Sequence, residues 1–116
     1  MNLYEIQEAI EAELERMEGL VAQLAQAGIE QSRAEANYKV HYAQERLRAR
    51  VAGTVDGVRA TQDHVDDLAT VATEDDLHER LMASNNLAVL KEALHASKTH
   101  IEALRTMAAS HRTVAP

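Results

Sequence analysis

Residues 87–111 read LAVLKEALHASKTHIEALRTMAASH, and this stretch decides the fold class. Its apolar positions alternate in steps of three and four residues, which is the heptad spacing of coiled-coil packing. The seam defined by this spacing consists of Leu87, Leu90, Leu94, Ser97, Ile101, Leu104, Ala108 and His111. A seam of this length predicts a long helix that packs along one stripe against another helix.

The helix that carries the seam has a clear start in the sequence. Thr73 is a preferred capping residue, and the next three residues, 74–76, are all acidic, which the helix dipole favours in a first turn. We therefore predict a helix over residues 74–112.

A second helical stripe occupies the first part of the chain. Its apolar residues are again three or four positions apart and predict a helix over residues 3–27. They are Leu3, Ile6, Ile10, Leu14, Met17, Val21 and Leu24. Asn2 with Glu5 three residues later resembles a capping pair, so we expect the helix to begin there.

Gly28 is the first candidate boundary between helices. Gly28 fits a left-handed helix stop, and Ser32 with Glu35 fits the capping box of a new helix. We therefore predict a turn at this point and a second helix over residues 32–52. The alternative is one continuous helix from residue 3 to about residue 51, because a single Gly costs only about 1 kcal/mol relative to Ala.

The second predicted helix has a stripe of small or aliphatic residues that we expect to face the core. They are Ala36, Val40, Ala43, Leu47 and Val51, with Tyr38 and Tyr42 beside them. Gly53 and Thr54 then supply a stop and a new cap. A third helix is predicted over residues 55–72, although Gly57 and several β-branched residues lower its helix propensity.

The amino-acid composition supports an all-helical protein. The 116 residues include 21 alanines, three Tyr, no Phe and no Trp, so little is available to fill a wide sheet-based core. One Pro and four Gly leave few turn signals for many short strands. We predict an all-α fold, an elongated antiparallel helical bundle of coiled-coil-like hairpins, that forms a single domain over residues 1–116.

The composition also excludes several classes of protein. The chain has no cysteine, which removes disulfides, thiolate metal sites and cysteine nucleophiles. No apolar run approaches the roughly 20 residues of a membrane span, and the N-terminal residues lack the basic start of a signal peptide. We expect a cytoplasmic protein that does not associate with membranes.

Charge changes sign along the chain in four segments. Residues 1–32 and 51–79 carry net charges of −6 and −7, and residues 33–50 and 80–116 carry +3 each, which gives −7 in total. Opposite charges on successive helices would favour antiparallel neighbours. The alternative interpretation is a set of solvated faces, because exposed ion pairs contribute only about 0 to 1 kcal/mol each.

The sequence contains no spacing that identifies a catalytic or metal site. Glu92 and His95 have the Glu-x-x-His spacing of carboxylate-bridged metal sites, but such sites need two of these units and two further Glu. The histidines lack HxH or HExxH spacing, and no serine lies in a nucleophile-elbow motif. The histidines are His41, His64, His78, His95, His100 and His111. We expect no enzyme activity, no metal and no cofactor.

Two charged clusters leave alternatives open. Arg46, Arg48 and Arg50 could contact phosphate, but nucleic-acid-binding domains usually carry net positive charge or an aromatic stacking platform, so we do not expect direct binding. The second cluster could imitate a phosphate backbone and occupy a basic site on another protein. It consists of Asp56, Asp63, Asp66, Asp67, Glu74, Asp75, Asp76 and Glu79.

Three segments resemble a set of short alanine-rich helical proteins of tailed bacteriophages and prophages, especially of actinobacteria. They are residues 38–43 (YKVHYA), residues 53–55 (GTV) and residues 101–112 (IEALRTMAASHR). The resemblance covers roughly residues 32–112 and departs over residues 56–72, which are longer and more acidic here. It implies a phage context among early, replication or recombination genes and supplies no catalytic residue.

We therefore predict a non-catalytic, phage-type interaction protein of the bacterial host cytoplasm that presents a helix face to a partner protein. The expected contacts are Tyr38, Tyr42, Arg46 and Arg50, because tyrosine and arginine contribute disproportionately at interfaces. One alternative is an accessory factor of phage DNA replication or recombination that contacts nucleic acid. The other is an acidic protein inhibitor of a host enzyme.

We also predict a homodimer. The seam of the last helix is longer than the predicted third helix can cover, and an exposed strip of leucine usually marks an interface. Two-fold dimers are the commonest closed assemblies. The expected interface residues are Leu87, Leu90, Leu94, Ile101 and Leu104.

Overall fold

The computed structural model describes residues 1–55 and 57–114 of the chain. Its elements are α1 (Leu3–Ala52), β1 (Thr54–Val55), β2 (Val58–Arg59), α2 (Gln62–Ala72) and α3 (Glu74–Val114). The prediction of an all-α fold built from antiparallel helices is confirmed, because each strand has only two residues. Asp56, part of the acidic cluster, lies outside the described residues.

The contacts within the chain form two compact units. Unit 1 comprises Met1–Ala27 and Asn86–Pro116, and unit 2 comprises Gly28–Asn85. One boundary between the units therefore falls at Gly28, where the sequence suggests a helix stop. Whether the two units fold as the single domain expected from the sequence stays a prediction.

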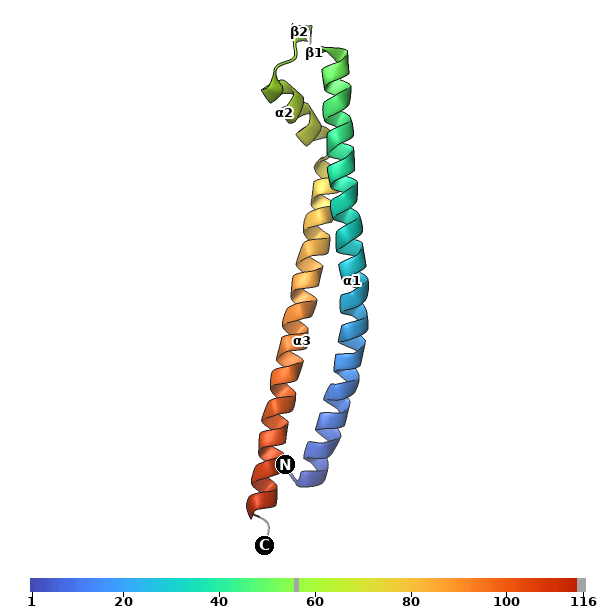
Figure 1. Ribbon diagram of the computed structural model, residues 1–116. Helices are drawn as coiled ribbons and strands as arrows, with labels where there is room; N and C mark the ends of the chain where they lie inside the picture. Colours follow the sequence, from blue (N-terminus) through green and yellow to red (C-terminus); the bar gives the residue numbers. More distant parts are fainter. Residues whose placement is uncertain (56, 115–116) are drawn as a thin grey trace. The chain divides into compact units, whose positions relative to one another are not determined.

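The predicted turn near residues 28–32 is wrong. α1 is a single helix of 50 residues, drawn without a break from blue to green in Figure 1. Gly28 is flanked by Ala, Gln and Glu residues that favour helix, and no Pro intervenes, so the cost of one Gly is offset by its neighbours. Downstream, Glu35 accepts a hydrogen bond from Gln31 and pairs with Lys39, both at helical i,i+4 spacing.

The predicted third helix over residues 55–72 is shorter than expected. α2 begins only at Gln62, and an antiparallel pairing of β1 with β2 precedes it. Gly53 and Gly57 adopt φ angles of 72° and 79°, a left-handed conformation that glycine reaches without steric cost. These two glycines allow the chain to leave α1 and reverse before α2 starts.

Side-chain caps explain where α1 and α2 begin. The backbone N–H of Glu5 donates to Asn2 Oδ1 at 2.8 Å, as the capping pair predicts. The N–H of His64 donates to Thr61 Oγ1 at 3.3 Å at the start of α2. Thr73 behaves differently from its predicted role, because its buried hydroxyl donates to a carbonyl in the last turn of α2. The predicted start of the last helix at residue 74 is nevertheless confirmed.

Unit 1 is an antiparallel pair formed by the beginning of α1 and the end of α3 (Figure 1). Its core contains Ile6, Leu104 and Ala108, with Leu3, Ala9 and Ile10 packed against them. The predicted seam of α3 faces α1 over most of its length, since Ser97, Ile101, Leu104 and Ala108 are buried and Leu87, Leu90 and Leu94 are half-buried. Its last member, His111, is exposed.

The buried face of α1 in unit 1 coincides with most of the predicted stripe, because Ile6 is buried and Leu3, Ile10, Met17 and Leu24 are half-buried. The buried residues Ile6, Leu20 and Ala27 are separated by multiples of seven, which is the periodicity of a coiled-coil position. Leu14 and Val21, which belong to the predicted stripe, are 41% and 52% exposed.

Unit 2 packs the end of α1 against α2 and the start of α3, and its buried side is not the predicted one. α2 contributes Val65 and Ala69, both buried. In the part of α1 that belongs to unit 2, only Ala49 is buried, and the half-buried side chains are mostly polar or aromatic. They are Gln31, Ala34, Glu35, Tyr38, His41, Tyr42, Glu45 and Arg46.

Gly28 and Gly53 provide a matched test of this chain path. Gly28 lies inside α1, and an added Cβ would meet no atom within 4 Å, so Gly28→Ala should raise the free energy of unfolding by about 0.5–1 kcal/mol. Gly53→Ala should lower it by about 1 kcal/mol, because alanine is strained at positive φ. Urea unfolding followed by circular dichroism measures both. Destabilisation by Gly28→Ala would instead indicate a turn at this position.

Candidate functional site

The most prominent surface of unit 2 is the apolar stripe that the sequence predicts to be buried. We call Ala36, Val40, Ala43, Leu47 and Val51 the outer stripe. All five are exposed, and Val40, Leu47 and Val51 are 57%, 62% and 79% exposed. The expectation that this stripe faces the core is therefore wrong. Neighbouring members are three or four residues apart, so they form one continuous line on the helix.

Basic residues border the outer stripe. Arg33, Lys39 and Arg50 are exposed and lie three or four residues from a stripe member, which makes them its neighbours on the helix surface. Arg48 is exposed three residues before Val51. The two acidic residues of segment 33–50, Glu35 and Glu45, are half-buried on the inner side. The stripe is therefore apolar along its line and positively charged along its borders.

The four predicted contact residues are engaged inside unit 2. The rings of Tyr38 and Tyr42 lie 5.9 Å apart, and the Arg80 guanidinium lies 5.1 Å from the centroid of the Tyr38 ring. Arg46 Nε lies 2.9 Å from Asp66 Oδ1, and Arg50 donates a 3.5 Å hydrogen bond to the side chain of Gln62. Their role as partner contacts stays a prediction, but each already has a neighbour within the chain.

The Arg46–Asp66 contact is an ion pair without a well-aligned hydrogen bond. The two atoms are close, yet Arg46 Nε is buried and its N–H lacks a hydrogen-bond acceptor among the described residues. The short distance and the opposite charges identify an electrostatic contact between α1 and α2. The poor alignment means that the charges, rather than a directed hydrogen bond, hold the pair.

His41 links α1 to α3 through two carboxylates. Its Nδ1 contacts Asp76 Oδ2, and its Nε2 lies 3.4 Å from Glu45 Oε1. The hydrogen bond with Asp76 raises the pKa of His41, desolvation opposes this effect, and the charges of Asp76 and Glu45 add to it. Arg80, also on α3, pairs with Glu35 at 3.5 Å. Opposite charges therefore join antiparallel neighbours in unit 2, as the segment charges suggest.

Unit 1 contains a polar cluster of Glu13, Ser97 and His100, here called the Glu13 cluster. Ser97 Oγ donates to Glu13 Oε1 at 2.5 Å, and His100 Nδ1 lies 3.2 Å from Glu13 Oε2. The hydrogen bond from Ser97 lowers the pKa of Glu13, partial desolvation opposes this effect, and His100 adds to the lowering. Ser97 is only 2% exposed, so no substrate can reach its hydroxyl. The geometry is that of a contact between helices.

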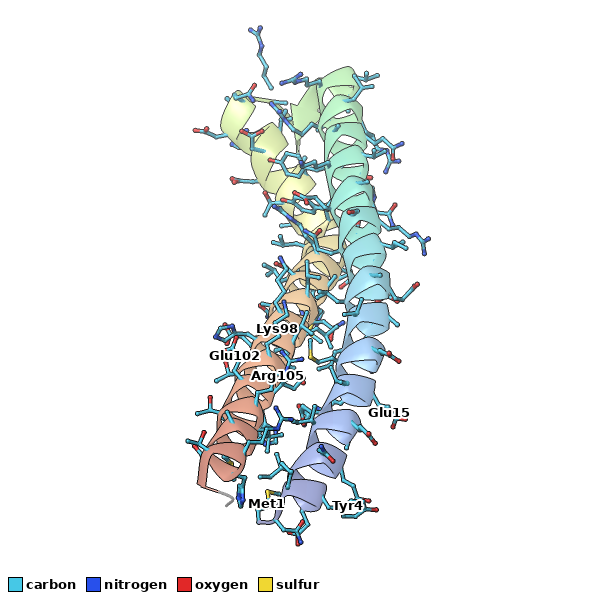
Figure 2. The ribbon with its side chains drawn as sticks, turned by 60° about the horizontal axis from the view of Figure 1, so that its bottom comes forward. Met1, Tyr4, Glu15, Lys98, Glu102 and Arg105 are labelled. Atoms are coloured by element: carbon cyan, nitrogen blue, oxygen red, sulfur yellow. The ribbon has the colours of Figure 1, made fainter. Side chains whose placement is uncertain are left out.

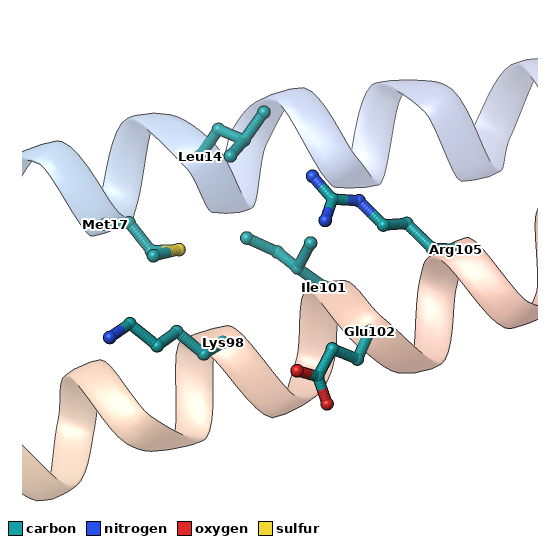
Figure 3. Close-up of a pocket in the computed structure, with 6 residues that line it drawn as sticks. All are labelled: Leu14, Met17, Lys98, Ile101, Glu102 and Arg105. Atoms are coloured by element: carbon teal, nitrogen blue, oxygen red, sulfur yellow. The ribbon is translucent and has the colours of Figure 1, made fainter.

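A groove runs along one side of unit 1. Leu14 and Met17 of α1 and Ile101 of α3 form its apolar part, and Lys98, Glu102 and Arg105 border it on α3 (Figure 3). It continues along α1 past Glu18 to Val21. Figure 2 shows Lys98 and Arg105 on α3 and Glu15 on the side of α1 that points away from α3.

The predicted dimer interface is covered within the single chain. Leu87, Leu90 and Leu94 are half-buried, and Ile101 and Leu104 are 4% and 3% exposed. The beginning of α1 packs along this seam and leaves Leu87, Leu90 and Leu94 partly exposed. The homodimer itself stays a prediction.

The two residues with metal-site spacing, Glu92 and His95, are not part of a metal-binding cluster in the described residues. Glu92 and His95 are both exposed. Within residues 1–55 and 57–114, no three His, Asp or Glu side chains gather closely enough to hold a metal ion. No helix in the described part of the chain combines the length and the apolar character needed to cross a membrane.

The sequence interpretation missed the Glu13 cluster, although a signal for it exists. Glu13 lies seven residues after Ile6 and seven before Leu20, so a strict heptad places it among buried residues. Ser97 is a member of the predicted seam. No comparable periodicity predicts the contact of His41 with Asp76, because it forms only when α1 packs against α3.

Comparison with known proteins gives no relative: no protein-family model, no curated protein and no solved structure matches the chain.

The contact of His41 with Asp76 predicts a pH-dependent stability. A raised pKa means that folded His41 keeps its proton to higher pH than the unfolded chain, so the stabilisation is complete below the ordinary histidine pKa and is lost as pH rises through the folded pKa. The free energy of unfolding should therefore fall more between about pH 5.5 and about pH 8.5 in the wild type than in His41→Gln. Urea unfolding at both pH values measures the difference. The exposed His95 gives the control His95→Gln, which should retain the wild-type behaviour; an unchanged pH dependence in His41→Gln would contradict the assignment.

Arg46 and Arg48 provide a matched test of whether charges join the helices. Arg46 pairs with Asp66 on α2, whereas Arg48 is 77% exposed and pairs with Glu45 on its own helix. Arg46→Glu should lower the free energy of unfolding by about 1 kcal/mol more than Arg48→Glu, although both variants change the net charge equally. The difference should shrink in about 1 M salt, where charges are screened. Equal effects of the two variants would favour the solvated-face interpretation.

Proposed function

We propose that this chain is a non-catalytic interaction protein that binds a partner protein through the outer stripe of unit 2. The observation that carries the proposal is the exposure of an uninterrupted apolar line on α1, while polar and aromatic residues of the same helix face inward. Exposed apolar surface that follows one line of a helix marks a site where another helix can dock. The three largest members, Val40, Leu47 and Val51, would be the central anchors.

Charge restricts the kind of partner. The borders of the stripe carry four bases, Arg33, Lys39, Arg48 and Arg50. The two acidic residues of the segment, Glu35 and Glu45, are half-buried and pair with Lys39 and Arg48, which leaves the borders with a net positive charge. A second copy of the same stripe would bring like charges together, which disfavours self-association at this site. An amphipathic helix with acidic borders would complement both the apolar line and its cations. We therefore propose an acidic helical segment of another protein as the partner.

The tyrosine pair supports the stripe from behind. Tyr38 and Tyr42 lie on the inner side of α1 and Arg80 covers the Tyr38 ring. Aromatic and cation–π contacts of this kind stabilise the orientation of a helix against its neighbour. On this proposal the predicted contact residues Tyr38 and Tyr42 act by holding α1 so that the stripe faces outward.

The two alternative functions, contact with nucleic acid and inhibition of a host enzyme by an acidic surface, have less support in the structure. The basic borders could contact nucleic acid, but they flank an apolar line with no aromatic side chain to stack on bases. In the acidic cluster, Asp66 and Asp76 are already paired with Arg46 and His41, which reduces the charge available to a basic site on another protein. A phage origin and a bacterial cytoplasmic location remain expectations from the sequence.

A crosslinking experiment tests the proposal. A photoreactive residue in place of Ala43 should crosslink to one partner protein in bacterial lysate. Val40→Ser combined with Leu47→Ser should reduce that capture about tenfold or more, because central apolar anchors dominate binding energy. Capture should also weaken with rising salt, because the borders of the stripe are charged.

Leu81 and Met82 supply the matched control. Both are apolar, lie in unit 2 and are 54% and 58% exposed. Leu81→Ser combined with Met82→Ser removes a similar apolar surface outside the stripe and should leave capture unchanged. Equal loss in both double variants would contradict a site on the outer stripe. Capture that disappears after nuclease treatment would favour the nucleic-acid alternative.

A further inference from the structure

The groove of unit 1 differs from the outer stripe in one decisive respect, which is the sign of the charges on its two borders. On α3 the border carries a net positive charge: Lys98, Glu102 and Arg105 line the groove, and Lys91 and Arg112 continue the line of bases at seven-residue intervals. On α1 the border is acidic, because Glu18 lines the groove and Glu11 lies seven residues before it.

These border charges are available for an external partner. Glu11, Glu18, Lys98 and Arg105 are exposed, and none of them forms an ion pair within the described residues. Between the borders lie Leu14, Met17, Val21 and Ile101, of which Leu14 and Val21 are large and exposed. The groove therefore has an apolar floor between an acidic and a basic border.

A surface with one acidic and one basic border is complementary to itself. We propose that a second copy of this chain docks on the groove around a two-fold axis parallel to the helices, so that α1 of each copy lies against α3 of the other. A two-fold axis brings the same patch of both copies together, which places each acidic border against a basic one. The product is a four-helix arrangement of two unit 1 hairpins.

The levels of the charges along the helices agree with this arrangement. Glu13 contacts Ser97 and His100, so these parts of α1 and α3 lie at the same level in unit 1. An axis parallel to the helices keeps every residue at its level. Glu11 then lies between the levels of Lys98 and Arg105 of the second copy, close to the level of Glu102. The two basic side chains flank this level and reach about one helical turn, so Glu11 meets two bases and one acid.

The alternative two-fold axis, perpendicular to the helices, is disfavoured by the same charges. It would place α1 against α1 and α3 against α3. Glu11 and Glu18 would then face a second acidic border, and Lys98 and Arg105 a second basic one. Like charges in apposition weaken such a contact, so charge selects the parallel axis.

Charge reversal with mixing tests the proposal. Light scattering coupled to size exclusion should give about twice the 12.8 kDa chain mass for the wild type at micromolar concentration. Glu11→Lys with Glu18→Lys makes both borders basic, and Lys98→Glu with Arg105→Glu makes both acidic, so each variant alone should be a monomer. An equimolar mixture should regain the mass of two chains, because each basic border then meets an acidic one. Circular dichroism confirms that both variants remain helical.

Glu8→Lys with Glu15→Lys is the matched control. Glu15 points away from α3 (Figure 2), and Glu8 lies seven residues before it on the same side of α1. This variant changes the net charge equally and should remain a dimer. A monomeric wild type, a dimer that survives either reversal, or a mixture that stays monomeric would overturn the proposal. The inference is independent of the proposed function, since Val40→Ser with Leu47→Ser should leave the dimer mass unchanged.

Discussion

A pair of antiparallel helices can bury only one narrow stripe of each partner. Apolar residues outside that stripe therefore stay at the surface of this protein. Nine hydrophobic residues are buried among the described residues, whereas fourteen large hydrophobic residues are exposed. Four of the nine are alanines, whose small side chains permit close approach of the helices. Apolar residues on a second line of the same helix, such as Leu47, stay largely exposed. Their exposure follows from the architecture.

The sequence predicts the type of fold better than the choice of buried face. The seam of α3 and the cap at Asn2 are local features, since each depends on residues within a few turns of one helix, and both predictions are confirmed. The continuity of α1 through Gly28 depends on a small balance between one glycine and several good helix formers. Which line of α1 faces inward depends on distant side chains: Asp66 and Asp76 find Arg46 and His41 only in the folded chain. Helical periodicity alone carries no information about such pairs.

Charge has two distinct roles in this molecule. On the inner side of unit 2, opposite charges join separate helices, as in the pair of Arg80 with Glu35. On the outer surfaces, the sign pattern indicates which partner each surface suits. The outer stripe has cations on its borders and favours an acidic helix of another protein. The groove has one acidic and one basic border and favours a second copy of the same chain. Two apolar surfaces of similar appearance are thereby assigned to different kinds of partner by their borders.

The Glu13 cluster has a consequence for how faithfully the hairpin of unit 1 closes. Seams of alanine and leucine resemble themselves after a shift of one heptad, so two such helices are prone to slippage. Slippage by seven residues would move Glu13 from Ser97 to the level of Leu90 or Leu104. A carboxylate held against leucine without a hydrogen-bond donor costs several kcal/mol. One glutamate in an otherwise repetitive seam thus fixes the register in which the two helices pack.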